Sequence, residues 1–190
     1  MKQTFLSLTL GILFLSACSL VPEMQNDIKG YKKPYVEPTS GERVRVRFTS
    51  DGLVRAIPNR DCLDWDVPEG GMVLDRTTVS FNDHSNQNKS LGMPDRAGSE
   101  KNGKKITELY AKANEPLVVD YQHLHCGLTA YFVPEAKADY EVDAFEIWTD
   151  IIGRYATCYF KLYRLEGAAP EIRRIPIPAT RTLTCQRMGR

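Results

Sequence analysis

Two histidines stand two positions apart in the segment His123-Leu124-His125, a spacing that suits a pair of metal ligands. In an extended strand residues i and i+2 point to the same face, so both imidazoles are expected on one side. A protein zinc site takes at least three side-chain ligands, and no third ligand lies nearby in the sequence. His84 belongs to a distant polar segment that nothing in the sequence brings closer. We therefore expect two ordinary histidines on a half-exposed strand, with no metal and no cofactor.

Carboxylates gather around Trp65, and calcium prefers several such groups on a flexible loop. The acidic residues are Asp61, Asp64, Asp66 and Glu69. Their spacing departs from that of an EF-hand loop, which places ligands at positions 1, 3 and 5 and a bidentate Glu at position 12. The segment is therefore expected to be a solvated acidic turn next to Cys62.

Two rows of side chains could bind a ligand. Arg43, Arg45 and Arg47 alternate with apolar residues, so they project from one face of a strand and could grip phosphate or carboxylate. Their ordinary alternative is a charged solvent face, placed opposite Asp139, Glu141 and Asp143. The second row is formed by Tyr155, Tyr159 and Tyr163. Exposed tyrosines suit glycan or protein binding, and their alternative is a covered layer of a sandwich.

Catalytic motifs are absent from the sequence. It contains no G-x-S-x-G, H-E-x-x-H, S-x-x-K or P-loop pattern. A glycosidase needs two positioned carboxylates, which sequence alone cannot place. We therefore expect a protein that is not an enzyme.

The N-terminus combines Lys2 with an apolar run from Phe5 to Leu15, which is typical of a signal peptide and too short to span a bilayer. The run ends at Leu15-Ser16-Ala17-Cys18, which resembles the lipobox of bacterial lipoproteins. The resemblance implies removal of residues 1–17 and acylation of Cys18. Because Ser19 is not the Asp linked to inner-membrane retention, it also implies anchoring in the outer membrane, on its periplasmic face.

Residues 18–41 are expected to form the lipidated N-terminus and a tether. Pro22, Pro34 and Pro38 interrupt any helix there, and the apolar residues are sparse. The alternative is that Tyr31 and Tyr35 pack onto the domain that follows. Either way, residues 42–190 are expected to form one folded domain.

The remaining cysteines point to disulfides. They are Cys62, Cys126, Cys158 and Cys185. An even number in an exported chain is typical of two disulfides, and three pairings are possible. We favour Cys62–Cys126 with Cys158–Cys185. A zinc site is disfavoured because no two of these cysteines are close in sequence.

Short runs of alternating or β-rich residues separated by turn signals predict an all-β fold. The expected strands are 43–48, 53–57, 72–81, 117–126, 129–133 and 180–186, with a hairpin formed by 140–149 and 155–165. Residues 106–113 fit strand or helix, and we favour strand. Residues 82–103 are expected to form a long loop, and the Pro-rich stretch 167–179 a connection. In 155–165 the alternation places Cys158 on the core side. The fold class is a single disulfide-containing β-sandwich, immunoglobulin-like or related.

Charge limits the possible partners. Residues 1–17 contain one basic residue and no acidic one, so the remaining chain holds 24 basic and 24 acidic residues. A nucleic-acid-binding protein usually carries a basic excess, so we expect no nucleic-acid partner. The expected function is a non-catalytic interaction or scaffold component of an envelope assembly, with the lipid-anchored membrane and an envelope protein as partners. The alternatives are a binder of a glycan or anionic envelope ligand, and an inhibitor or immunity protein against a periplasmic toxin.

Overall fold

A computed structural model gives the fold of the chain, and it describes residues 33–75, 88–94, 104–148, 155–167 and 171–185. The described strands are β1 (Arg43–Ser50), β2 (Leu53–Pro58), β3 (Gly71–Leu74), β4 (Lys105–Lys112), β5 (Leu117–Gln122), β6 (Gly127–Phe132), β7 (Asp139–Trp148), β8 (Ala156–Glu166), β9 (Arg173–Pro176) and β10 (Thr180–Arg181). In these ranges no helix has the length and apolar character needed to cross a membrane. Cys18 and the signal segment lie outside the described residues.

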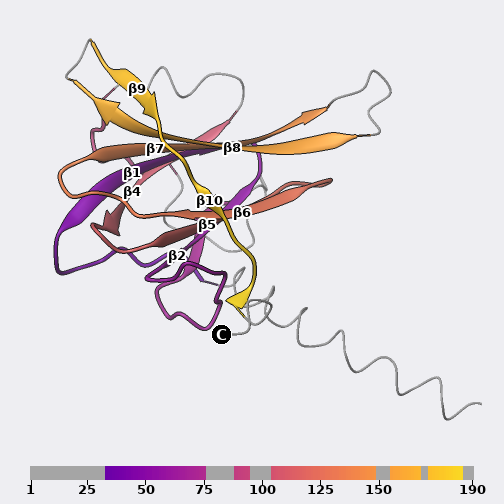
Figure 1. The fold of residues 1–190 in the computed structure, drawn as a ribbon, viewed down its shortest axis with the longest axis horizontal. Coiled ribbons are helices and arrows are strands. Elements are labelled where there is room, and N and C mark those ends of the chain that lie inside the picture. The colour runs from indigo at the N-terminus through magenta and orange to yellow at the C-terminus, as the bar shows by residue number, and fades with distance from the viewer. Residues whose placement is uncertain (1–32, 76–87, 95–103, 149–154, 168–170, 186–190) are drawn as a thin grey trace, which may run out of the picture.

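Two five-stranded sheets are stacked in layers (Figure 1). One has the order β4-β1-β7-β8-β9 and the other the order β10-β6-β5-β2-β3. All neighbours are antiparallel except β1 and β7, which run parallel. The predicted all-β, disulfide-containing sandwich is confirmed.

The period-two pattern of the strands builds the core between the sheets. From β1, Val44, Val46 and Phe48 point inward and are at most 2% exposed. They meet inward-facing residues of the second sheet such as Val119 and Tyr121. The opposite face of the second sheet carries a smaller cluster around Trp65. In β1, one face is therefore fixed by apolar burial, which also fixes where the polar residues of the strand point.

The chain before β1 is partly packed. Tyr35 is 4% exposed, and its backbone N–H donates to the carbonyl of Met72 at 2.8 Å. The packing alternative therefore holds for Tyr35, while Tyr31 lies outside the described residues. The folded part begins before residue 42.

Most predicted strands are found. Residues 105–112 form the strand β4, as favoured. The predicted hairpin is β7 with β8, although residues 149–154 of its turn are outside the described ranges. Of the predicted strand 72–81, residues 71–74 form β3, and 76–81 are not described. The last strand is shorter than predicted, with only Thr180–Arg181 in β10.

The stretch 167–179, expected to be only a connection, contains the short strand β9 at Arg173–Pro176. This strand pairs with the far end of β8, between Tyr163 and Glu166. Proline is tolerated at a sheet edge because its missing N–H removes no bond to an inner neighbour. Pro176 therefore did not prevent a short edge strand.

The favoured disulfide pairing is also wrong, since the bonds are Cys62–Cys185 and Cys126–Cys158. The connection from β2 to β3 lies beside the C-terminal segment, where the Leu63 N–H donates to the Leu183 carbonyl at 2.9 Å. That contact brings Cys62 to Cys185. Cys158 does face inward, as predicted, where it meets the β5–β6 turn of the other sheet and bonds to Cys126.

Candidate functional site

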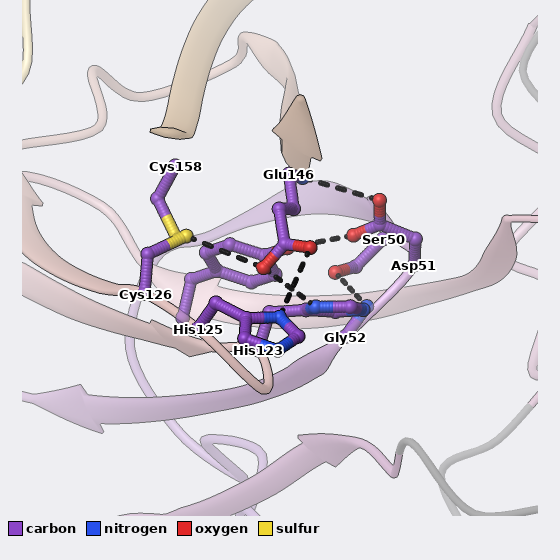
Figure 2. The surroundings of a disulfide bond; sticks show 9 residues. Ser50, Asp51, Gly52, His123, His125, Cys126, Glu146 and Cys158 are labelled. Atoms are coloured by element: carbon purple, nitrogen blue, oxygen red, sulfur yellow. Dashed lines mark hydrogen bonds and ion pairs between the residues drawn. A yellow bond between two sulfur atoms is a disulfide. The ribbon is translucent and has the colours of Figure 1, made fainter. Parts of the chain in front are cut away.

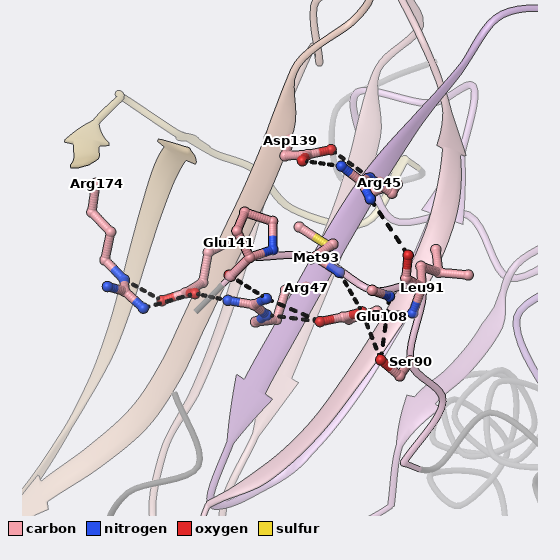
Figure 3. Close-up of polar contacts among 11 residues, drawn as sticks. Arg45, Arg47, Ser90, Leu91, Met93, Glu108, Asp139, Glu141 and Arg174 are labelled. Carbon is pink, nitrogen blue, oxygen red and sulfur yellow. Dashed lines mark hydrogen bonds and ion pairs between the residues drawn. The ribbon is translucent and has the colours of Figure 1, made fainter. Parts of the chain in front are cut away.

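The arginine row of β1 does not form an anion-binding surface. Arg47 is fully buried, and its guanidinium lies 3.0 Å from the carboxylates of both Glu108 and Glu141 (Figure 3). Arg47 also donates to the Pro94 carbonyl at 2.7 Å. The guanidinium is therefore committed to internal partners.

Glu108 anchors the described part of the long loop. Its Oε2 accepts the backbone N–H groups of Leu91 at 2.6 Å and Met93 at 3.2 Å. Burial alone would raise the pKa of Glu108, but these two backbone bonds and the Arg47 guanidinium outweigh it and lower that pKa below its ordinary value. Residues 88–94 thus cover the face of β1 that carries Arg47.

The other two arginines of the row differ in their surroundings, since Arg45 forms an ion pair and Arg43 is exposed. Arg45 binds both oxygens of Asp139, at 2.8 and 2.5 Å. Arg43 is exposed and lies over the Tyr110 ring, 4.6 Å from its centre. The alternative of a charged solvent face is wrong for Arg47 and Glu141, which pair with each other but are buried. Asp139 does lie opposite the row, whereas Asp143 binds Thr49 and Lys104.

The tyrosine row is only partly exposed. Tyr155 and Tyr159 are 66% and 37% exposed, and Tyr159 stacks on Phe145 with ring centres 5.4 Å apart. Tyr163 is half-buried, and its burial raises its pKa. Two of the three predicted ligand-binding tyrosines therefore remain on an accessible surface.

The outer edge of β8 near these tyrosines is open. β9 pairs only with Tyr163–Glu166, and no described residue pairs with that side of β8 between Ala156 and Lys161. A groove of about 440 Å³ runs there between β8 and the second sheet. Its lining is formed by Cys126, Gly127, Leu128, Thr129, Ala156, Thr157, Cys158, Arg181, Thr182 and Leu183. Within it Leu183 is 59% exposed, so the groove has an accessible apolar wall.

The Cys126–Cys158 disulfide bounds this groove and also contacts a second cluster. Glu146 of β7 pairs directly with Cys158 of β8 in the sheet register. Its Oε2 lies 3.6 Å from Cys126 Sγ and 2.8 Å from His123 Nδ1, and its Oε1 lies 3.7 Å from His125 Nδ1 (Figure 2). Among the described residues, His123, His125 and Glu146 alone bring three potential metal ligands within 4.8 Å of one another.

The histidines lie on a different element from the one expected. They belong to the turn between β5 and β6, which the His123 N–H closes by donating to the Cys126 carbonyl at 2.9 Å. The strand argument for a shared face was therefore wrong, although both imidazoles still face one carboxylate. His84 lies outside the described residues.

The acidic segment around Trp65 makes local contacts. Arg60 pairs with Asp64 at 3.2 Å, and Asp64 accepts the Asp66 N–H at 3.0 Å. Trp65 is buried under the Arg55 guanidinium, 4.1 Å from its ring centre. These contacts agree with the expected acidic turn.

Comparisons of the chain with protein-family models, curated proteins and solved structures found no match. The functional argument therefore rests on geometry. Glu146 is the site residue that sequence reasoning missed. The signal for it was its inward position in β7, because it shares a face with Tyr140, Val142 and Ala144. A carboxylate on the core side of a strand needs a buried partner.

Proposed function

We propose that this chain is an exported lipoprotein, anchored through Cys18 to the periplasmic face of the outer membrane, that acts as a non-catalytic interaction component of an envelope assembly. The observation that carries the interaction is the open edge of β8 beside the groove. An edge strand with unpaired backbone groups is a template for another strand.

The partner we propose is an extended segment of an envelope protein. Such a segment would add a strand to Ala156–Lys161 by main-chain hydrogen bonds, while alternate side chains enter neighbouring pockets. Leu183 and the Cys126–Cys158 disulfide offer an apolar wall for those side chains. Tyr159 offers contact area with a polar tip on the outer face of β8.

The anionic-ligand alternative has less support than the sequence suggested. Arg47 is buried and Arg45 is paired with Asp139, so Arg43 is the exposed member of the row. A glycan could still stack on Tyr155 and Tyr159. An inhibitor of a periplasmic toxin would bind a single enzyme through the same edge of β8. The identity of the cross-linked partner therefore distinguishes an inhibitor from a scaffold protein.

Photo-cross-linking in cells tests the docking edge. Benzoylphenylalanine replaces Thr157, which is exposed and lines the groove. In the matched control it replaces Glu42, an exposed residue just before β1, at the end of the first sheet that lies away from the groove. We expect one protein adduct from position 157 and none from 42, and its loss when Leu183→Glu is added. Adducts at both positions, or at neither, would contradict the proposal, and glycan adducts would favour the alternative.

The anchor has its own test. We expect intact-mass analysis to find residues 1–17 removed and acyl chains on Cys18, and Cys18→Ser to release the chain from the membrane fraction. An unmodified Cys18 in wild-type protein would overturn the lipoprotein assignment without bearing on the β8 edge.

A further inference from the structure

We propose that His123, His125 and Glu146 form a binding site for a first-row divalent metal ion, for which Zn²⁺ is the probe. The site stands independently of the lipid anchor and of the docking edge. Two observations carry it: the convergence of three ligands from two elements, the β5–β6 turn and β7, and buried polar atoms in the cluster that have no hydrogen-bond partner among the described residues.

The distances suit a metal ion. Zinc bonds of about 2.0–2.1 Å to nitrogen and oxygen place tetrahedral ligand atoms roughly 3.3 Å apart. Glu146 Oε2 lies 2.8 Å from His123 Nδ1, and Glu146 Oε1 lies 3.7 Å from His125 Nδ1. One ligand atom from each of the three residues lies within 4.8 Å of the other two.

Two unsatisfied polar atoms of the cluster favour a cation site. The Glu146 side chain is 2% exposed, and its Oε1 has no hydrogen-bond partner in the described structure. His123 Nδ1 also has none, since its 2.8 Å contact with Oε2 lacks the alignment of a hydrogen bond. Buried polar atoms are nearly always satisfied, so these two require an explanation. A cation held between them would satisfy both.

The surroundings hold the ligands in place. The Cys126–Cys158 disulfide ties the histidine turn to the strand beside Glu146 (Figure 2). Asp51 accepts the Glu146 backbone N–H at 3.1 Å and the Tyr121 hydroxyl at 2.7 Å. Trp148 packs edge-on against His125, with ring centres 4.5 Å apart. Rigid support of this kind is what preorganises a metal site.

The close turn between β1 and β2 keeps Asp51 beside the cluster. The Gly52 N–H donates to Ser50 Oγ at 3.0 Å. A Cβ on Gly52 would lie 2.6 Å from both the Tyr121 ring and the Gln122 carbonyl oxygen. Glycine is therefore required for this approach of the first sheet to the β5–β6 turn.

The donor set selects the ion. Two imidazoles and one carboxylate suit Zn²⁺ and its first-row neighbours, whereas Ca²⁺ and Mg²⁺ prefer all-oxygen sites. The disulfide sulfurs carry no thiolate and are not ligands. His125 is 47% exposed in its side chain, so the site opens to solvent. Three protein ligands leave one position for water or for a partner's side chain.

Equilibrium dialysis of the full chain, purified in detergent, against buffered Zn²⁺ tests the site. We expect one ion per chain, unaffected by millimolar Ca²⁺. Glu146→Gln keeps the shape of the side chain and removes its charge, and we expect at least a 10-fold loss of affinity, the size reported for disturbing even the supports of metal ligands. His125→Ala, at a half-exposed position, serves as the second variant should Glu146→Gln not fold.

Controls separate ligand loss from disturbance of the turn. Leu124→Ala changes an exposed residue between the two histidines, and Glu42→Gln removes an exposed carboxylate elsewhere, so both should keep wild-type affinity. Nitrogen-15 spectra of the histidines should shift Nδ1 of both His123 and His125 on zinc addition. The proposal is overturned by the absence of stoichiometric zinc, or by binding unchanged in Glu146→Gln and His125→Ala.

Discussion

The first sheet holds buried carboxylates in two clusters that differ in how completely they are satisfied. Around Arg47, Glu108 and Glu141 bind one guanidinium, backbone N–H groups and a second guanidinium from Arg174 at 3.0 Å (Figure 3). Around Glu146, two imidazoles approach the carboxylate, yet Oε1 and His123 Nδ1 lack hydrogen bonds within the described structure. Both clusters contain buried carboxylates. Among the described residues, however, the buried polar atoms without a hydrogen-bond partner lie in the Glu146 cluster.

This difference separates a structural role from a binding role. A saturated buried ion network has no remaining capacity for a ligand, and it fixes how the strands and the covering segment 88–94 pack. A preorganised cluster with unsatisfied atoms gains stability when a ligand completes it. Breaking the first should strongly destabilise the protein, whereas breaking the second should change what it binds.

The largest expected effect comes from breaking the saturated network. Arg47→Met leaves Glu108 and Glu141 buried without their shared cation, and we expect a loss of about 3–5 kcal/mol in the free energy of unfolding, measured in urea. Arg43→Met removes an exposed cation–π contact and should cost about 1 kcal/mol or less. A loss below 1 kcal/mol for Arg47→Met would contradict the assignment of a structural role.

Removing the disulfide beside the unsatisfied cluster comes next. Cys126→Ser with Cys158→Ser opens a link between residues 32 apart in sequence, worth about 3.7 kcal/mol in the chain-entropy model. Because the histidine turn loses its tie to β8, we also expect zinc affinity to fall. Cys62→Ser with Cys185→Ser should destabilise at least as much but leave zinc affinity unchanged at temperatures where the variant is folded. An equal loss of zinc affinity in both double variants would contradict a local role of the Cys126–Cys158 disulfide at the zinc site.

Acid should weaken the saturated network in a defined range. The pKa of Glu108 is lowered in the folded state, so its stabilisation is fully present above its unfolded value of 4.5 and is lost as pH falls through the folded value below that. Urea unfolding between pH 6 and 3 should show this decline. Glu108→Gln should reduce its slope by up to about 1.4 kcal/mol per pH unit, and an unchanged slope would exclude Glu108 as a contributor.

Alternation in the sequence was sufficient to predict the architecture, and it placed Val44, Val46 and Phe48 in the core. It did not reveal that the opposite face of β1 is covered, because period two says which residues share a face and not what packs on it. The segment 88–94 supplies that cover from a predicted loop. β9 was missed because two prolines and several charges mask a four-residue edge strand.

The candidate metal site was also predicted only in part from the sequence. The spacing of His123 and His125 is visible in the sequence, but Glu146 reaches them only through the stacking of two sheets. The disulfide pairing failed for that reason too, since Cys62 meets Cys185 through the path of the C-terminal segment. Contacts between distant elements depend on strand order, and strand order depends on the whole chain.

Thermal unfolding of three proteins, in chelator and with Zn²⁺ at 100 times its Kd, tests the contrast between the clusters most directly. We predict that wild type and Arg47→Met each gain about 2.7 kcal/mol from zinc, although Arg47→Met starts from a much lower stability. Glu146→Gln should stay within about 1 kcal/mol of wild type in chelator, because the amide keeps the shape of the side chain and removes a buried charge, and should gain nothing from zinc. A Glu146→Gln protein as unstable in chelator as Arg47→Met, with no zinc effect on wild type, would show that both clusters are structural.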